Sequence, residues 1–101
     1  MFDNRGDTRV TQTARRTVEI INQRGLHARA SAKFVAAVSV LEGCDVLVTK
    51  DGQEAAGGSI LGLMMLGAAK GDKIEIVVTG HDADARLEKL AGLVIDGFGE
   101  D

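Results

Sequence analysis

The sequence predicts one α+β domain, an open-faced sandwich in which three helices cover one face of a four-stranded antiparallel sheet. Segments whose apolar residues alternate are interspersed with segments whose apolar residues recur at helical spacing, in the order β-α-β-β-α-β-α. Each alternating segment has one apolar face and each helical segment one apolar stripe, and a sheet covered on one side buries them all. With 101 residues, of which 45% are hydrophobic, the chain can form a single packed core.

The chain begins with a segment that predicts no regular structure. Residues 1–16 are polar and show neither period, so we predict a flexible N-terminal arm, followed by a single domain over residues 17–101. Residues 17–22 alternate as a half-buried strand does. A helical stripe then begins at Ala28, and Gly43 is placed to end that helix. The apolar residues of the stripe are Ala30, Phe34, Val35, Val38 and Leu41.

A β-hairpin is predicted after the first helix. Residues 44–50 alternate and are rich in β-branched side chains. Asp51-Gly52 then predicts a two-residue type I′ turn, because both turn positions require a positive φ. Residues 53–57 return as a short, Ala-rich strand.

Two helices and one strand complete the predicted fold. Residues 59–66 predict a short helix, with Ser59 as its N-cap and Gly67 after its end. Residues 73–80 alternate as a strand, and Asp82 is placed to cap the last helix. The stripe of that helix comprises Ala83, Leu87, Leu90, Ala91, Val94 and Ile95.

Composition and charge disfavour several classes of function. The formal net charge is −3, and the three aromatic residues are all Phe, which disfavours a nucleic-acid partner and an RNA-binding use of the glycine-rich loop. The lone Cys44 cannot form an intramolecular disulfide. No signal peptide or membrane segment is evident, so we expect a cytoplasmic monomer that does not bind membranes.

The stretch "RGLHARASAKFV", residues 24–35, places His27 between two arginines where a loop pattern gives way to a helical one. The first turn of a helix leaves N–H groups unpaired and carries a partial positive charge, which favours a bound anion. Arg24 and Arg29 add charge-assisted contacts, and a neutral imidazole can attack a phosphoryl group. These residues allow a phosphohistidine, but a capping or structural role is equally open at this point. No Cys or second His lies at ligand spacing, so no metal site is predicted.

A second histidine, His81, provides a comparison within the chain. It also lies in a Gly-His loop before a helix, but its neighbours Asp82 and Asp84 would occupy the helix N-terminus and repel phosphate. We therefore interpret His81 as a surface turn residue.

The stretches "GLHARASAKFV", "DG" and "GGSILGLMMLGAAKGD" resemble the histidine-containing phosphocarrier (HPr) family of the bacterial phosphoenolpyruvate-dependent phosphotransferase system, over about residues 17–98. The resemblance implies four antiparallel strands, three helices and a carrier without a cofactor, which is not itself an enzyme. It implies that His27 accepts phosphate on Nδ1 from phospho-enzyme I and donates it to an EIIA-type protein. The acceptor chain could serve sugar uptake or a nitrogen-type regulatory system.

The resemblance also implies roles for neighbouring residues. Arg29 matches the arginine that contacts the phosphoryl group, and the amides of Ala28, Arg29 and Ala30 would complete the phosphate cradle. Ser59 matches the position that a dedicated kinase, HPr kinase/phosphorylase, modifies in some members, and this role is compatible with capping. An alternative function is a regulatory module of this fold controlled through Ser59, but such modules lack the histidine.

The helix over residues 59–66 is apolar almost all round, whereas a sheet can cover only one side of it. We predict Leu63 and Leu66 in the core. By resemblance to the family's partner-binding surface, we expect Ile60, Leu61 and Met64, together with Arg24, to dock partners.

The sequence departs from the family pattern at Ala30, where many members have proline in "H-x-R-P". Proline at this position would pre-set φ and remove an N–H that has no helical partner. Alanine costs some rigidity and adds an N–H that phosphate could use. We expect activity to survive this change.

Overall fold

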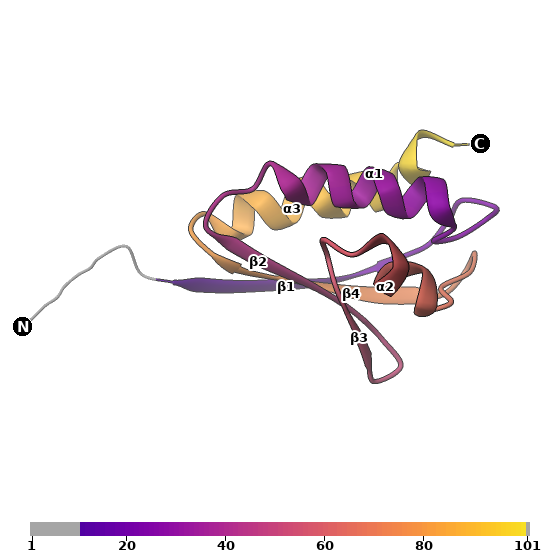
Figure 1. Ribbon diagram of the computed structural model, residues 1–101, viewed down its shortest axis with the longest axis horizontal. Helices are drawn as coiled ribbons and strands as arrows, with labels where there is room; N and C mark the ends of the chain where they lie inside the picture. The colour runs from indigo at the N-terminus through magenta and orange to yellow at the C-terminus, as the bar shows by residue number, and fades with distance from the viewer. Residues whose placement is uncertain (1–10, 101) are drawn as a thin grey trace, which may run out of the picture.

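The computed structural model describes residues 11–100 of the chain (Figure 1). Four strands form one antiparallel sheet in the order β1-β4-β2-β3. Figure 1 shows α1 and α3 side by side over one face of this sheet, with α2 on the same side. The predicted fold class is therefore confirmed. The elements are β1 (Gln12–Glu19), α1 (Ala28–Ser39), β2 (Cys44–Lys50), β3 (Gln53–Ala56), α2 (Ile60–Met65), β4 (Lys73–Gly80), α3 (Ala83–Ile95) and the short 3-10 helix η2 (Gly97–Gly99).

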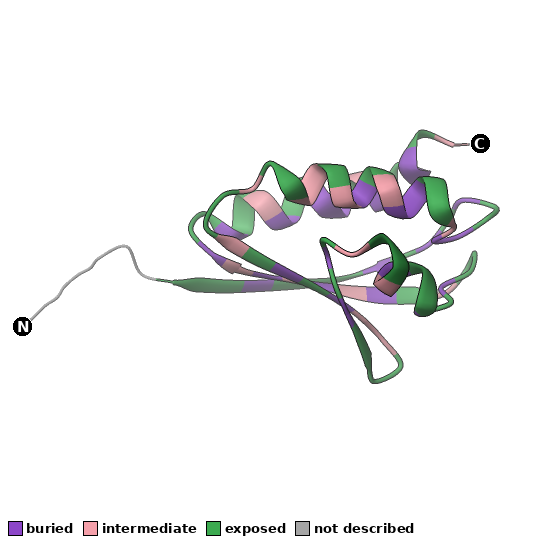
Figure 2. Ribbon diagram, in the orientation of Figure 1, coloured by how far each residue is buried: buried purple, intermediate pink, exposed green. Residues whose placement is uncertain are grey.

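The core lies between the helices and the inward face of the sheet (Figure 2). In β4, Ile74, Ile76 and Val78 are buried while the residues between them are partly exposed, as the period-two pattern predicts. The stripe of α1 is buried at Ala30 and Phe34. Its remaining members pack partly buried at the edge of the core, and they are Val35, Val38 and Leu41.

The strand β1 corrects the predicted boundary of the N-terminal arm. It begins at Gln12 and pairs with β4 along its whole length, so residues 12–16 belong to the sheet and not to an arm. The sequence concealed this because Ala14 is the inward-facing apolar residue of the segment, and alanine gives a weak alternation signal. Arg16 links β1 to α3, because its guanidinium donates a hydrogen bond of 2.6 Å to the carboxylate of Glu88. Residues 1–10 of the predicted arm lie outside the described residues.

The local signals in the middle of the chain are confirmed. Asp51 and Gly52 both have positive φ values, 50° and 83°, as a type I′ turn requires. At the start of α2, the Ser59 side chain accepts a hydrogen bond of 2.9 Å from the amide of Gly62. Leu63 and Leu66 are buried as predicted.

Two predicted details of α3 are wrong. Ile95 is 48% exposed, because it follows the buried Val94 by one residue, a rotation of about 100° around the helix. Asp82 occupies the N-cap position, but its backbone is left-handed, with φ 56°, and its carboxylate makes no capping hydrogen bond. That carboxylate instead lies 3.6 Å from Nε2 of His81.

Beyond α3 the chain forms a turn that the sequence did not predict, which we call the C-terminal clasp (residues 97–100). Gly97, Phe98 and Gly99 have φ values of 65°, 59° and 72°, so all three lie in the left-handed region. Phe98 is buried in the core. Lys33 of α1 donates to the carbonyl oxygen of Phe98 over 2.6 Å, which ties the clasp to the first helix.

Candidate functional site

A tight turn places His27 at the start of α1. Gly25 has a φ of 61°, and a Cβ at this position would lie 2.3 Å from the carbonyl oxygen of Ala68, so glycine is required on two grounds. The buried Leu26 donates its amide to the same carbonyl over 2.9 Å. The backbone that leads into His27 is therefore fixed against the segment that follows α2.

The first turn of α1 leaves its backbone donors available. His27 is the N-cap residue, with an extended backbone and no side-chain capping bond, and its carbonyl accepts from the amide of Ser31 over 2.9 Å. Within residues 11–100, the amides of Ala28, Arg29 and Ala30 have no hydrogen-bond partner. The first turn also has no acidic residue. This helix end thus has the electrostatics of an anion site.

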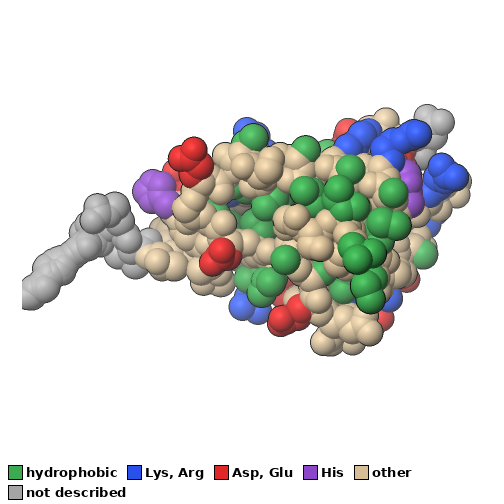
Figure 3. Space-filling model, in the orientation of Figure 1, with side chains coloured by type: hydrophobic (Ala, Val, Ile, Leu, Met, Phe, Trp, Pro, Cys, Tyr) green, Lys and Arg blue, Asp and Glu red, His purple; other side chains and the backbone are tan. Residues whose placement is uncertain are grey.

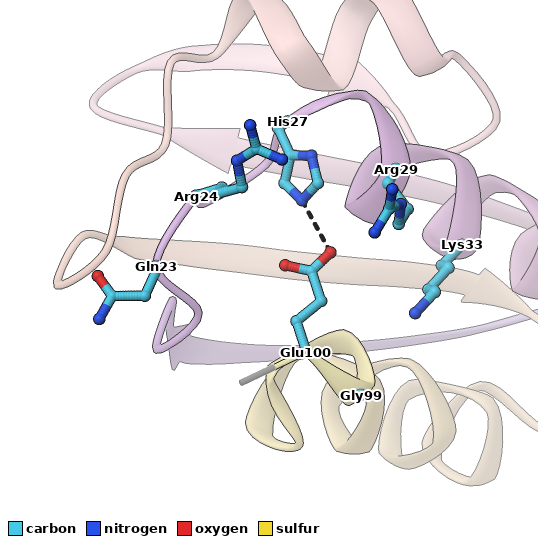
Figure 4. Close-up of a pocket in the computed structure, with 7 residues that line it drawn as sticks. All are labelled: Gln23, Arg24, His27, Arg29, Lys33, Gly99 and Glu100. Carbon is cyan, nitrogen blue, oxygen red and sulfur yellow. Dashed lines mark hydrogen bonds and ion pairs between the residues drawn. The ribbon is translucent and has the colours of Figure 1, made fainter.

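A hollow of about 430 Å³ opens beside the imidazole (Figure 4). Figure 4 shows the side chains of Arg24, Arg29 and Lys33 around this hollow, with Glu100 approaching His27 from the clasp. Three cations therefore face one carboxylate. The lining residues are Gln23, Arg24, His27, Arg29, Lys33, Gly99 and Glu100.

Glu100 is a site residue that sequence reasoning missed, and it places a carboxylate in contact with the ring of His27. Its Oε2 lies 2.8 Å from Nε2 of His27, and its Oε1 accepts from Nδ2 of Asn22 over 3.1 Å. Asn22 is buried and also donates to the carbonyl of Gly25 over 2.9 Å. His27 and Glu100 are 73 residues apart in sequence, so no local pattern could connect them.

The surroundings of Glu100 hold the pKa of its carboxyl below the ordinary value for glutamate. Desolvation is the largest single influence and raises this pKa. The hydrogen bonds from His27 and Asn22, with the charges of His27 and Lys33, act in the opposite direction and together prevail. Glu100 is therefore ionised near neutral pH.

An apolar patch lies on α2, which packs beside α1. Its exposed side chains have exposed fractions of 41% for Ile60, 68% for Leu61, 40% for Met64 and 73% for Met65. The first three are the residues predicted to dock partners, and the side chain of Met65 belongs to the same exposed apolar patch. Figure 3 shows apolar side chains gathered beside a cluster of Lys and Arg side chains at the same end of the molecule.

His81 lies in a different setting from His27. Its side chain is 67% exposed and faces Asp82, and the loop between β4 and α3 lies at the other end of the sheet from the start of α1 (Figure 1). The two histidines therefore share a local sequence context but not a site.

Two kinds of feature are absent from the part of the chain that the structure describes. No group of three or more His, Cys, Asp or Glu side chains is arranged to hold a metal ion. No helix there is long and apolar enough to cross a bilayer.

The fold and the site together define a small carrier domain, with one histidine at an open helix N-terminus beside an apolar helix. A family model described as "PTS HPr component phosphorylation site" matches residues 14–96. The chain therefore belongs to the HPr family of phosphocarrier proteins of the phosphotransferase system.

Similar proteins span nearly the whole chain. Phosphocarrier protein HPr of Neisseria meningitidis serogroup A is 45% identical over 86 residues, which are 85% of this chain and 96% of that protein. Phosphocarrier protein NPr of Escherichia coli K12 is 36% identical over 89 residues, covering 88% and 99%. The crystal structure of HPr from Thermoanaerobacter tengcongensis superposes with a TM-score of 0.81 at 34% identity, covering 87% of this chain and 98% of that one. These relatives support a phosphocarrier function.

Proposed function

We propose that Nδ1 of His27 accepts a phosphoryl group from phospho-enzyme I and passes it to an EIIA-type protein, in sugar uptake or in a nitrogen-type regulatory chain. The observation that carries this proposal is the position of the imidazole, at a helix N-terminus whose first three amides are unpartnered among the described residues. The side chains of Arg24 and Arg29 face the same hollow. A phosphate bound to the ring would gain hydrogen bonds and charge compensation together.

The transfer needs no further chemical group from this chain. The lone pair of Nδ1 forms the new N–P bond as the bond between phosphorus and the donor protein breaks, and the leaving electron pair stays on the donor atom. The amides of Ala28, Arg29 and Ala30 then hold the phosphoryl oxygens, and Arg29 neutralises their charge. The phosphoramidate keeps a high transfer potential, so the same bond can pass the group to the next acceptor.

The apolar patch on α2 is the proposed docking surface for both partners. Ile60, Leu61 and Met64 lie next to one another on α2 and expose an apolar patch of the kind that marks protein interaction sites, and Arg24 lines the hollow beside His27. A partner that covers this patch would place its own reacting group near the imidazole. Water would be excluded during transfer.

Ser59 is the proposed site of regulatory phosphorylation by a dedicated kinase. Its hydroxyl caps α2 and immediately precedes the docking patch. A phosphate there would add up to about two negative charges beside Ile60 and Leu61. Docking of an acidic partner surface would weaken as a result.

The test of the carrier function is an intact-mass measurement after incubation with phosphoenolpyruvate and enzyme I. The wild-type chain should gain one acid-labile phosphoryl group, whereas His27→Ala should gain none, because the nucleophile is gone. His81→Ala is the matched control and should be phosphorylated normally. A wild-type chain that gains no phosphate, or a His27→Ala chain that gains as much as wild type, would overturn the proposal.

A further inference from the structure

The contact with Glu100 determines which ring nitrogen of His27 is available. The Oε2 atom of Glu100 lies 2.8 Å from Nε2 of His27. An ionised carboxylate only accepts hydrogen bonds, so Nε2 is the donor and carries the proton. When the imidazole is neutral it has a single N–H, and with that proton on Nε2 the Nδ1 atom keeps its lone pair.

We propose that Glu100 is a positioning residue for phosphoryl transfer, which holds the proton of His27 on Nε2 and thereby presents Nδ1 as the nucleophile. This inference rests on the proposed function, because it assigns Glu100 a part in the reaction of His27. The Glu100 carboxylate contacts the ring at Nε2, so Nδ1 stays open toward the amides of α1.

The carboxylate is held in place from several sides. Phe98 anchors the clasp in the core, with its side chain 1% exposed, and Lys33 donates to its carbonyl oxygen over 2.6 Å. Asn22 donates to Oε1 of Glu100 from a fully buried position. The side chain of Glu100 itself is only 16% exposed. These contacts supply the second layer of support that a precisely oriented catalytic group requires.

The charges around His27 give Glu100 an electrostatic role as well. Arg24 from the preceding loop and Arg29 from α1 line the hollow beside the ring, Lys33 from α1 lies beside the clasp, and Glu100 of the clasp contacts the ring. The three cations favour a phosphate, but they oppose the positive charge that the ring acquires when Nδ1 forms its bond to phosphorus. Glu100 contacts the nitrogen that carries the ring proton and offsets that charge.

The proposed step is balanced without an additional proton donor or acceptor. The Nδ1 lone pair forms the N–P bond while the donor protein keeps the electron pair of the bond that breaks. The proton stays on Nε2, shared with Oε2 of Glu100. In the transfer to the acceptor, the N–P bond breaks, its electron pair returns to Nδ1, and the imidazole leaves as a neutral ring. Glu100 should accelerate both the phosphorylation of His27 and the transfer from His27 to the acceptor, since a group that assists a step also assists its reverse.

The test compares Glu100→Gln with wild type in two independent measurements. Glutamine keeps the size of the side chain but has no charge, and its amide can donate as well as accept, so it does not fix the tautomer. Side-chain nitrogen-15 NMR of the unphosphorylated protein should show His27 as the Nε2–H tautomer in wild type and as a mixture in the variant. Phosphorylation by enzyme I at saturation should be about fivefold slower, with little change in the half-saturating concentration.

Glu42→Gln is the matched control, because it removes the same charge beyond the other end of α1. It should retain both the wild-type tautomer and the wild-type rate. Backbone amide spectra of Glu100→Gln should match wild type away from the clasp, and the NMR measurement needs no partner protein. If Glu100→Gln keeps the Nε2–H tautomer and the wild-type rate while His27 is still phosphorylated, the role of Glu100 is refuted alone. A wild-type protein that is never phosphorylated would instead refute the proposed function.

Discussion

The residues around His27 offer two kinds of contact to a phosphate. The amides of Ala28, Arg29 and Ala30 are fixed by the helix backbone, so in the proposed mechanism they would define where the phosphoryl oxygens lie. The guanidinium of Arg29 is on an exposed side chain and would contribute mainly charge. The amides would thus position the phosphate, and Arg29 would neutralise its charge. A substitution of Arg29 can test the second role without disturbing the helix.

Replacement of Arg29 by alanine should slow phosphorylation of His27 about tenfold, because a charge-assisted hydrogen bond to phosphate is lost. The fold should be almost unchanged, since the side chain is exposed. Stopped-flow or quench-flow transfer from enzyme I measures the rate, and urea unfolding checks stability.

The control for this change is Arg15→Ala on the uncovered face of the sheet, where the side chain is 63% exposed. It removes the same charge far from the first turn of α1 and should leave the rate unaltered. An Arg29→Ala protein that transfers at the wild-type rate would remove Arg29 from the proposed mechanism.

Sequence reasoning could identify the part of the site that lies within one short stretch. His27, Arg24 and Arg29 are adjacent to a helix start, and the physics of helix ends connects them. Lys33 was missed, although the sequence did contain a signal for it. Lys33 follows Arg29 by one helical turn and therefore lies on the same face of α1. Glu100 gave no signal, since only the folded clasp brings it to His27.

At the scale of elements, α2 is exceptional because it is short and largely unburied. Of its six residues, Leu63 is the one that is buried. An element that contributes so little to the core is positioned mainly by its cap at Ser59 and by its contacts with α1 and β3. Residues on its exposed face can therefore be substituted with little loss of stability.

The substitution Met64→Glu should weaken binding to enzyme I about tenfold, because it places a charge in the proposed apolar docking patch. Isothermal titration calorimetry or a fluorescence titration measures the affinity. Val40→Glu places the same charge at another exposed apolar position, 73% exposed beyond the end of α1, and should bind normally. Equal affinities of the two variants would locate the docking surface elsewhere.

The elements were predictable where apolar periodicity was strong and were missed where it was weak. β4 and the β2–β3 hairpin follow from clean alternation and from Asp51-Gly52. The first half of β1 was missed because its inward position is Ala14, and pairing with β4 determines it. The clasp was missed because three successive left-handed residues have no periodic signature, and the burial of Phe98 stabilises them.

At the scale of the whole molecule, the site makes the stability of the folded protein depend on pH. Four segments meet there: the turn that contains Asn22, the start of α1, the clasp and the segment at Ala68. The Glu100 carboxylate links three of them, and its pKa is lower in the folded protein than in the unfolded chain. A lowered carboxyl pKa stabilises the fold above the unfolded-state value of about 4.3 and ceases to do so as the pH falls through the folded-state value.

The free energy of unfolding of wild type should therefore exceed that of Glu100→Gln at pH values above about 5. The difference between the two free energies should narrow as the pH falls below about 4. Urea unfolding of both proteins across this range measures the difference directly. Because the other carboxylates titrate alike in the two proteins, their effects cancel in the comparison. A stability gap that widens with falling pH would contradict the assigned pKa shift.

The strand order β1-β4-β2-β3 has a consequence for synthesis of the chain on the ribosome. β4 lies between β1 and β2, so a nascent chain that ends before residue 73 lacks the strand that joins β1 to the β2–β3 hairpin and cannot assemble the four-stranded sheet. His27 is made early, but its carboxylate partner emerges only with residue 100. Translation must therefore bring the chain out of the ribosomal tunnel as far as residue 100 before the histidine acquires its final surroundings.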